Sequence, residues 1–445
     1  MKNLLIKVEP DRIIGTIKPM HGVGGGPVSS IFAYNAVQEF RAAGIPFGRL
    51  HDIEYPFGSG EFVDVHCIFP YFDADENDPG AYNFTLTDEY LMYMREAGTE
   101  PFYRLGAAIE HQRVKRHIHP PKDIDKFARI CSRIVAHYNE GWADGYEWNI
   151  RYWEIWNEPD IPQCWTGTPQ QAFELYRAVS SLIRREHPNV KIGGLALTSP
   201  YSAMFEPFLA YARQTDAPLD FVSWHGYCHT PAQAVANARR ARELMDKYGF
   251  TQAESIYDEW NYVVSWKELQ PSIDLHRTAF GAAFMAAVIA SMQKEAVDKL
   301  MFYDAQMLQP VWNNLFRPKP MTEHAAMRGV DTLKGYWTLY AWNKLYEAGT
   351  SVFCEAPEDV YCAAAETPEG ETLLYISYFN DDAGLNSCPP PDASVRVSLP
   401  GRTVRSMTVY KADDAHDFEP LQAKDGEFRM QGNSFALVRI PAAAV

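Results

Sequence analysis

The sequence contains few cysteines, and none of them stand in a C-x-x-C spacing. An even set of closely spaced cysteines is typical of a disulfide framework, and paired cysteines or histidines are typical of a zinc site. The odd number found here therefore favours reduced thiols and a cytoplasmic enzyme, although a chain that has lost a leader peptide would have the same composition. The seven residues are Cys67, Cys131, Cys164, Cys228, Cys354, Cys362 and Cys388.

The sequence also lacks an excess of positive charge and any long hydrophobic run. Lys and Arg number 41 against 57 Asp and Glu, which gives a formal net charge of -16. No basic stripe reverses this charge locally, so a nucleic acid partner is not expected. The first apolar run ends at Lys7 and is too short for a signal peptide, and no run of about 18 apolar residues follows, so no membrane partner is expected.

From about residue 15 to residue 345, short apolar or β-branched runs alternate with longer amphipathic stretches. This alternation is typical of repeated βα units and a parallel sheet. Helical patterns fall between the runs, at 123–138, 172–186, 231–248 and 276–293. Eight such units predict an α/β fold of the (β/α)8 TIM barrel type. The eight predicted strands cover residues 13–21, 46–52, 100–106, 151–158, 191–197, 220–227, 254–260 and 299–305.

The composition changes after Asn343. Segments such as ETLLYISYFN and SFALVRI alternate apolar and polar residues between Gly, Pro and Asp turns, a pattern that predicts an accessory antiparallel β-sandwich. The opening strand NLLIKVEP precedes the barrel and is a candidate to pair with that sandwich. We therefore expect a catalytic barrel over residues 13–343 and a β-sandwich over residues 344–445, joined by the N-terminal strand at 1–12.

Three segments resemble ligand sites only superficially. HGVGGGP at 21–27 lacks the Lys-Ser/Thr of a P-loop and the spacing of a dinucleotide fingerprint, and is interpreted as a loop after the first barrel strand, with His21 near the substrate. His111, His117 and His119 have no partner cluster at metal-ligand spacing. FDADENDPG lacks the ligand pattern of an EF-hand. We expect neither a metal nor a cofactor. The long connection from His51 to Thr87, which includes YPFGSGEF, is expected to shape the substrate mouth.

Two glutamates carry the chemical prediction. Glu158 closes the fourth predicted strand, where Pro159 ends it, and Glu259 closes the seventh. Barrel enzymes assemble their active sites at the carboxyl ends of the strands, so both side chains are expected at one face. Retaining glycoside hydrolysis needs two carboxyl groups about 5 Å apart, one as acid and base and one as nucleophile. The pair predicts that chemistry.

Three ordered motifs give the chain a resemblance to a known family. They are Asn157-Glu158-Pro159 on the fourth strand, His225-Gly226-Tyr227 on the sixth and Glu259-Trp260-Asn261 on the seventh. This pattern resembles the glycoside hydrolases of clan A, and family 39 most closely. The likeness extends over most of the barrel and is weak in the β-sandwich. It implies a retaining mechanism with Glu158 as the acid/base and Glu259 as the nucleophile.

The resemblance also implies roles for neighbouring residues. Asn157 would hold the sugar's 2-hydroxyl group, His225 and His51 would bind other hydroxyls, and Tyr227 or Arg49 would keep Glu259 ionised. Trp165 and Trp260 are the tryptophans we expect as sugar platforms, because aromatic faces suit the apolar face of a pyranose. Core packing is the alternative for the tryptophans, and an internal ion pair is the alternative for Arg49.

Two positions depart from the family pattern. Family xylosidases usually carry Thr before the nucleophile, where this chain has Asp258, so a further carboxylate is expected beside Glu259. The eighth strand usually ends near a tryptophan, whereas this chain offers Tyr303 there and Trp312 only in the following loop. Both departures leave open which sugar occupies the first subsite.

The sequence therefore predicts an exo-acting hydrolase of the β-xylosidase type with an oligosaccharide or glycoside substrate. Another clan A exo-glycosidase, namely an arabinosidase, a β-glucosidase or a β-galactosidase, is the alternative within enzymes. A carbohydrate-binding barrel without turnover is the alternative outside them, although binding alone requires no paired acid and nucleophile. A homo-oligomer is compatible with this fold.

Overall fold

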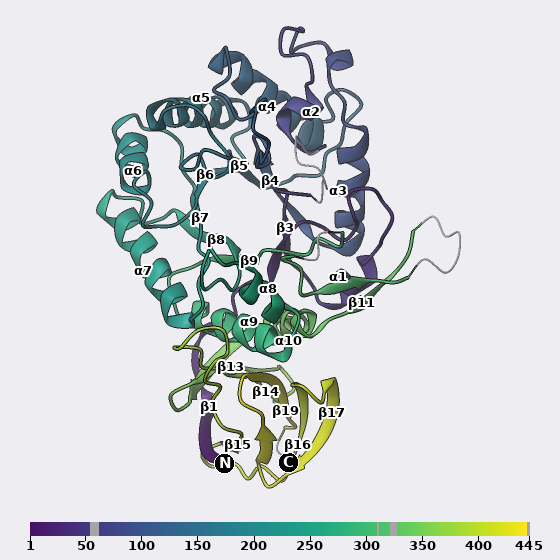
Figure 1. Cartoon of the computed structure of the whole chain (residues 1–445), viewed down its shortest axis with the longest axis vertical. Helices are drawn as coiled ribbons and strands as arrows, with labels where there is room; N and C mark the ends of the chain where they lie inside the picture. The colour runs from purple at the N-terminus through teal and green to yellow at the C-terminus, as the bar shows by residue number, and fades with distance from the viewer. Residues whose placement is uncertain (54–61, 309–310, 321–326, 443–445) are drawn as a thin grey trace.

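The computed structural model describes residues 1–53, 62–308, 311–320 and 327–442. Its larger part is a closed barrel of eight parallel strands surrounded by helices (Figure 1), as the sequence predicts. Each strand pairs in parallel with the next, and the last pairs with the first. In chain order the barrel strands are β2 (Gly22–Gly24), β3 (Phe47–Arg49), β4 (Glu100–Leu105), β5 (Tyr152–Ile155), β6 (Lys191–Leu197), β7 (Phe221–His225), β8 (Glu254–Trp260) and β9 (Lys299–Phe302).

Three of the α-helices that cover the barrel, α4 (Ile124–Glu140), α5 (Pro169–Glu186) and α7 (Pro231–Lys247), begin after a residue whose side chain accepts a hydrogen bond from a backbone amide of the first turn. Thr168 and Gln171 form a capping box at the start of α5, and Thr230 and Gln233 form one at the start of α7, each followed by a proline at the first helical position. The outer helices are α1 (Val37–Ala42), α2 (Val65–Ile68), α3 (Thr85–Ala97), α4 (Ile124–Glu140), α5 (Pro169–Glu186), α6 (Phe205–Gln214), α7 (Pro231–Lys247), α8 (Gln270–His276), α9 (Ala279–Met292) and α10 (Lys334–Ala348); Pro79–Ala81 form a 3-10 helix.

The first predicted barrel strand, residues 13–21, is wrong. Residues 13–16 are the end of β1 (Lys2–Thr16), a strand of the other sheet, and the first barrel strand is β2, inside the glycine-rich segment predicted as a loop. A Cβ on Gly22 would lie 2.9 Å from the carbonyl oxygen of Leu300, so close packing of the strands explains the glycine. The domain boundaries predicted from the sequence, between residues 12 and 13 and between residues 343 and 344, fall inside β1 and α10.

The second sheet consists of nine strands that wrap around their own apolar core and close on themselves as a β-sandwich. Neighbouring strands are antiparallel, except that β1 runs parallel to β15 while it pairs antiparallel with β12. Besides β1, its strands are β12 (Thr350–Glu355), β13 (Val360–Glu366), β14 (Thr372–Tyr378), β15 (Ala393–Ser398), β16 (Ser406–Ala412), β17 (Asp417–Lys424), β18 (Glu427–Met430) and β19 (Ser434–Ile440). Strands β10 (Phe316–Pro318) and β11 (Val330–Thr332) pair with each other as a separate two-stranded antiparallel sheet.

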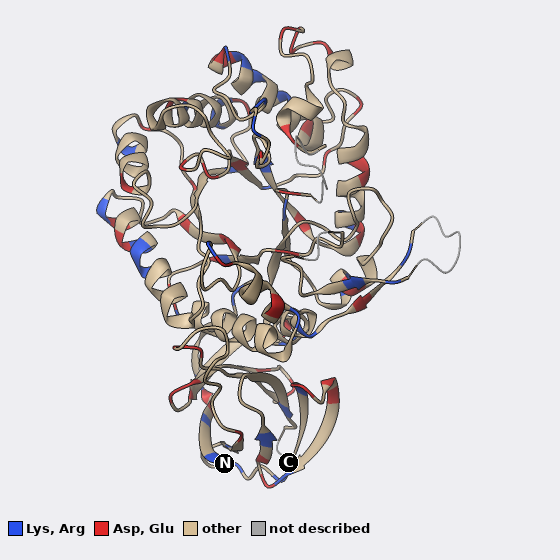
Figure 2. Ribbon diagram, viewed as in Figure 1, with Lys and Arg blue, Asp and Glu red and all other residues tan. Residues whose placement is uncertain are grey.

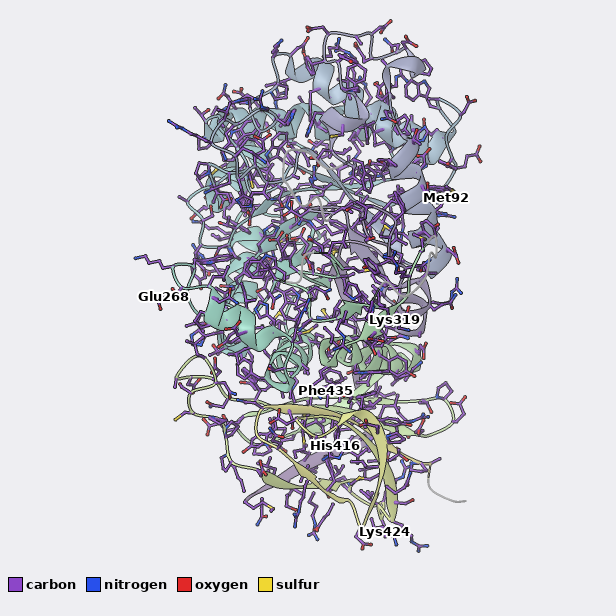
Figure 3. The ribbon with its side chains drawn as sticks, turned by 45° about the vertical axis from the view of Figure 1, so that its right-hand side comes forward. Met92, Glu268, Lys319, His416, Lys424 and Phe435 are labelled. Atoms are coloured by element: carbon purple, nitrogen blue, oxygen red, sulfur yellow. The ribbon has the colours of Figure 1, made fainter. Side chains whose placement is uncertain are left out.

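Helices α9 and α10 lie between the barrel and the β-sandwich (Figure 1). Thirteen residues of α9 are buried, because this helix is covered on all sides. Strand β19 alternates between two cores: Phe435 and Leu437 pack in the large core shared with the barrel, and Val438 packs inside the sandwich. Figure 3 accordingly shows Phe435 at the side of the sandwich that faces the barrel and Lys424 at its far end.

Among the residues that the structure describes, no single helix is both long and apolar enough to cross a membrane; the bent pair α8 and α9 would satisfy that test by length and composition alone.

The barrel interior is filled in layers. The lower layer is apolar and takes one side chain from each of six strands: Phe47, Phe102, Tyr152, Phe221, Ile256 and Met301. Above it lie buried charged groups, among them Arg49, Glu154 and Asp258. Figure 2 shows acidic and basic segments together around the barrel opening. The apolar layer closes the barrel below, so a ligand can approach the charged layer only from the carboxyl ends of the strands.

Candidate active site

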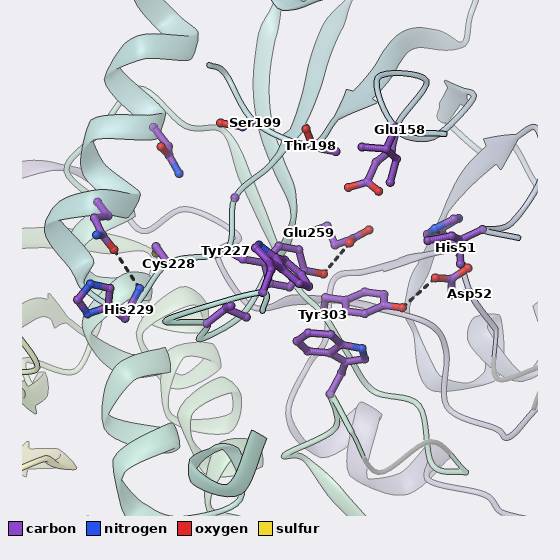
Figure 4. A pocket seen from close by; sticks show the side chains of 18 of the residues that line it. His51, Asp52, Glu158, Thr198, Ser199, Tyr227, Cys228, His229, Glu259 and Tyr303 are labelled. Carbon is purple, nitrogen blue, oxygen red and sulfur yellow. Dashed lines mark hydrogen bonds and ion pairs between the residues drawn. The ribbon is translucent and has the colours of Figure 1, made fainter. Parts of the chain in front are cut away.

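A cavity of about 810 Å³ opens at the carboxyl ends of the barrel strands. This volume lies within the range of small-molecule sites, which is roughly 300–1,000 Å³. Figure 4 shows Glu158 and Glu259 facing each other across it. The side chains around it lie at or follow the ends of the seven barrel strands from β3 to β9, and include His51, Asp52, His111, Glu158, Thr198, Ser199, Tyr227, His229, Glu259, Trp266, Tyr303 and Trp312.

The two predicted glutamates lie together. One carboxylate oxygen of Glu158, one of Glu259 and a ring nitrogen of His225 are all within 4.8 Å of one another. Retaining glycosidases hold their two carboxyl groups about 5–5.5 Å apart, whereas inverting enzymes need a wider gap for a water molecule. The spacing therefore suits a direct attack on a sugar carbon by one carboxylate.

The backbone around Glu158 is fixed in an uncommon conformation. Trp156 and Glu158 have φ angles of 67° and 44°, in the left-handed region that residues with a Cβ seldom adopt. The amide of Trp156 donates to the carbonyl of Leu105 over 2.9 Å, and the amide of Glu158 donates to the carbonyl of Ala196 over 3.0 Å. The ends of β4 and β6 thus hold the turn from both sides, and strain of this kind is common where a side chain must be aimed at a substrate.

The surroundings of Glu158 favour its protonated form. Burial, with the nearby carboxylate of Asp160, raises the pKa of Glu158 to about 8. Its Oε1 lies 2.7 Å from Nδ1 of His225, and burial lowers the pKa of that histidine to about 4. A neutral imidazole beside the carboxyl group does not draw its proton away, so Glu158 is suited to act as an acid near neutral pH.

Glu259 has partners that favour its charged form. Tyr227 donates its hydroxyl hydrogen to Oε1 over 2.6 Å (Figure 4), and Nη1 of Arg49 donates to Oε2 over 3.0 Å. Burial raises the pKa of Glu259, and these two donors work against that effect. Both partners were predicted. Arg49 also forms internal ion pairs, so the two alternatives that the sequence left open for it are both realised.

Asn157 and His225 lie below the cavity surface. Both are buried, and Oδ1 of Asn157 accepts a hydrogen bond from Nη2 of Arg49 over 2.6 Å. Nδ2 of Asn157 lies 3.7 Å from Sγ of Cys164, which itself lies 3.9 Å from Oε2 of Glu158. The structure thus brings these two predicted residues next to the glutamates.

A second hydrogen-bonded group lines the cavity near the glutamates (Figure 4). The hydroxyl of Tyr303 donates to Oδ2 of Asp52 over 2.9 Å (Figure 4), and Nε2 of His51 lies 3.3 Å from Oδ1 of the same carboxylate. Burial and the neighbouring Arg49 keep the pKa of His51 well below its usual value. His51 and Tyr303 were predicted, but Asp52 was not, although it directly follows His51 in the RLHD motif.

The aromatic side chains at the mouth differ in part from the prediction. Trp312 lines the cavity as predicted, and its ring centroid lies 5.9 Å from that of Trp266, which the sequence analysis missed. Trp266 is 61% exposed and also packs edge-on against Tyr227. A tryptophan within the polar segment SWKELQ, which follows β8, is the signal that would have identified it.

Three predicted substrate contacts are wrong. Trp260 is enclosed by Tyr257, Phe284 and Phe302 and packs in the core. Trp165 is buried edge-on against Trp156, behind the loop that carries Glu158, and does not line the cavity. His21 precedes β2, at the opposite end of the barrel, where its Nε2 lies 3.0 Å from the carbonyl oxygen of Gly44.

The connection from His51 to Thr87 is only partly described. Residues 54–61, which hold most of YPFGSGEF, lie outside the described residues, so their predicted place at the mouth stays a prediction. His51 and Asp52 line the cavity. The carboxylates of the acidic segment FDADENDPG instead bind backbone amides of the same segment: Asp75 accepts from the amide of Asn77, and Asp78 accepts from that of Gly80.

Glu158, His225 and Glu259 form the single group with metal-ligand spacing in the described part of the chain. The donor set does not suit a divalent cation well, since the guanidinium of Arg49 already occupies Oε2 of Glu259 and Nδ1 of His225 is engaged with Glu158. A cation bound there would face a fixed positive charge. The group is better suited to a neutral substrate than to an ion.

Comparison with known proteins places these observations in a family. Residues 5–319 match the family described as Glycosyl hydrolases family 39. A β-xylosidase of Geobacillus stearothermophilus is 25% identical over 265 residues, which are 53% of this chain and 51% of that protein. A β-xylosidase of Caldicellulosiruptor saccharolyticus is 26% identical over 239 residues, which are 48% of this chain and 47% of that protein. The chain thus spans about half the length of the curated relatives it matches.

Solved structures share the whole fold. A glucosidase from Croceicoccus marinus covers 100% of this chain and 99% of its own, with a TM-score of 0.78 and 23% identity. A monomeric β-xylosidase from Caulobacter crescentus covers 99% of this chain and 100% of its own, with a TM-score of 0.70 and 16% identity. The barrel with its accessory β-sandwich is therefore a fold that these proteins have in common.

Proposed function

The chain belongs to glycosyl hydrolases family 39, and we propose that it is a retaining glycosidase that releases a terminal sugar, with Glu259 as the nucleophile and Glu158 as the acid/base. The observation that carries the proposal is the spacing of the two carboxylates, whose facing oxygens lie within 4.8 Å. Their different environments support the assignment of roles: among the described residues, Glu259 accepts from a guanidinium and a phenol, whereas Glu158 accepts from neither.

In the first step, an oxygen of ionised Glu259 attacks the anomeric carbon while Glu158 gives its proton to the glycosidic oxygen. The bond from the anomeric carbon to the leaving oxygen breaks, and the leaving group departs as an alcohol. The glycosyl group is then joined to Glu259 through an ester. Asn157, held by Arg49 below the cavity, lies next to both glutamates and is suited to the sugar's 2-hydroxyl group.

In the second step, Glu158 is a carboxylate and takes a proton from water, whose oxygen attacks the anomeric carbon. The ester bond to Glu259 breaks, the free sugar leaves with retained configuration, and both glutamates return to their starting states. The pKa of about 8 for Glu158 supports both roles near neutral pH, since the group can give and regain a proton there.

For the sugar itself we propose β-xylose or a related pentose in the first subsite. Support comes from the two curated relatives, which are both named β-xylosidases. Asp52 and Tyr303, at the side of the cavity opposite Ser199, are the polar groups placed to distinguish sugars that differ at ring hydroxyls. The cytoplasmic location and a homo-oligomeric state remain predictions.

Two measurements test the function. A panel of nitrophenyl glycosides should show the highest kcat/KM with the β-xyloside, and a 2-deoxy-2-fluoro glycoside of the best substrate should inactivate the protein by labelling Glu259, detected by mass spectrometry of peptides. Glu259→Gln should lose at least about 10³-fold in kcat and should not be labelled. Inactivity on every glycoside, or a label on another residue, would contradict the assignment.

A further inference from the structure

Strand β8 contains a bulge at the residue before the nucleophile. Its pairing with β7 runs from Trp224 opposite Tyr257 directly to His225 opposite Glu259, so Asp258 has no partner on β7. In a regular strand, neighbouring side chains point to opposite faces, and an extra residue changes that alternation. The bulge lets two consecutive carboxyl groups point into the barrel, with Asp258 lying in the buried layer beneath Glu259.

Asp258 joins a cluster in which three carboxyl groups share one guanidinium. Nε of Arg49 lies 3.1 Å from Oδ2 of Asp258 and 2.8 Å from Oε2 of Glu154, and its Nη1 lies 3.0 Å from Oε2 of Glu259. Asp258 and Glu154 are both shielded from solvent, with relative exposures of 1% and 0%. Nε2 of His225 is 3.6 Å from Oδ1 of Asp258.

The charges of this cluster do not balance if every carboxyl group is ionised. The cationic partner that faces Asp258 is Arg49, from β3; Glu154 faces it from β5 and Glu259 from β8, and burial keeps His225, from β7, neutral. Full ionisation would leave one positive and three negative charges out of water. Buried charges without a compensating partner strongly destabilise a fold, so one carboxyl group is expected to bind a proton.

The contacts indicate which group binds it. Nε and Nη2 of Arg49 both lie 2.8 Å from Oε2 of Glu154, whereas Oδ2 of Asp258 lies 3.1 Å from Nε and accepts no hydrogen bond among the described residues. Within the described residues, both carboxyl oxygens of Asp258 are buried without a hydrogen-bond donor, and this carboxyl group faces that of Glu154. Burial and the charge of Glu154 raise the pKa of Asp258 well above its usual value.

We propose that Asp258 is a neutral positioning residue whose carboxyl proton is donated to Glu154, so that Arg49 is held by Glu154 and keeps one N–H for the nucleophile. This inference rests on the proposed function of Glu259. A neutral Asp258 adds no negative charge beneath Glu259, and therefore does not raise the pKa that the nucleophile must keep low. An ionised Asp258 would do so.

The test compares two isosteric variants. Asp258→Asn replaces the protonated acid with a neutral amide that also donates to Glu154. The rate of labelling by the fluorinated glycoside, measured against pH, should have the same acidic limb as the wild type, with rates within about threefold. The double variant Asp258→Asn/Glu154→Gln leaves Glu259 as the single anionic partner of Arg49 in this cluster, so its acidic limb should move to lower pH.

A downward shift of the limb in Asp258→Asn alone would show that Asp258 is normally ionised, and would overturn the inference. Infrared difference spectra of wild type minus Asp258→Asn at neutral pH give a readout that does not depend on activity: a buried carboxylic acid band is expected, and a carboxylate band would contradict it. Failure of the proposed function is distinguishable, because in that case the wild type is not labelled at any pH.

Discussion

Oε1 of Glu158 and Nδ1 of His225 lie 2.7 Å apart, which joins the end of β5 to the end of β7 directly above the buried charged layer. Burial lowers the pKa of His225 to about 4 and raises that of Glu158 to about 8. Near neutral pH, Glu158 is therefore protonated and His225 is uncharged. The same histidine nitrogen is 3.6 Å from Oε2 of Glu259, so His225 lies close to both carboxyl groups.

Glu158→Ala should lower kcat by about 10²–10⁴-fold for substrates with poor leaving groups, the usual contribution of a general acid. The first step should be nearly unaffected for a dinitrophenyl glycoside, because that leaving group departs without a proton. Added azide should restore turnover by replacing the water that Glu158 activates, and should yield a glycosyl azide of retained configuration. Equal losses for all leaving groups would contradict the acid role.

The basic limb of the kcat/KM profile should lie near pH 8 and should depend on Asp160. The proposed mechanism requires protonated Glu158, and the negative charge of Asp160 helps to raise the pKa of that group. Asp160→Asn should therefore move the basic limb to lower pH. Thr198→Val is the matched control, since it removes the 2.6 Å bond from Thr198 Oγ1 to Asp160 and leaves the charge in place. A limb that stays fixed in Asp160→Asn would contradict this account.

Glu158→Gln should stabilise the fold, and more strongly as the pH rises. The pKa of Glu158 is raised from 4.5 in the unfolded chain to about 8 when folded, so the unfolded state loses this proton first. Between those two values the free energy of unfolding of the wild type should fall, relative to Glu158→Gln, by about 1.4 kcal/mol per pH unit. Denaturant titrations at pH 4.5 and pH 8 measure the difference, and the lower pH serves as the internal control. A constant difference would contradict the raised pKa.

Removal of the aromatic rings at the mouth should weaken substrate binding. Trp266→Ala and Trp312→Ala should each raise KM by up to about tenfold, since a stacked aromatic contact contributes roughly 0.5–1.5 kcal/mol. Because Trp266 is exposed, Trp266→Ala should change the midpoint temperature of thermal unfolding little. Trp260→Phe is the contrasting variant: it should lower the midpoint and leave KM unchanged, because Trp260 packs in the core. The reverse pattern would restore Trp260 as a substrate contact.

The sequence predicts the barrel well because its evidence is local. Alternating apolar runs mark seven of the eight strands, and a glutamate at the end of a strand keeps that place once the sheet closes. The first barrel strand has no such apolar run. Its residues, Gly22–Gly24, are too few and too small to give a hydrophobic run, so the stronger apolar pattern of β1 was assigned in its place.

By itself, then, the sequence determined the fold class, the placement of Glu158 and Glu259 at one end of the barrel and the partners of Glu259, since strand position and motif order fix which side chains reach the rim. Only the tertiary structure decided which tryptophans face solvent and where His21 lies. Tryptophan and histidine side chains pack in protein cores as readily as they bind sugars, so the residue type alone does not distinguish the two places. It alone also revealed the bulge at Asp258, since a shift in register depends on the neighbouring strand and leaves no local pattern in the chain.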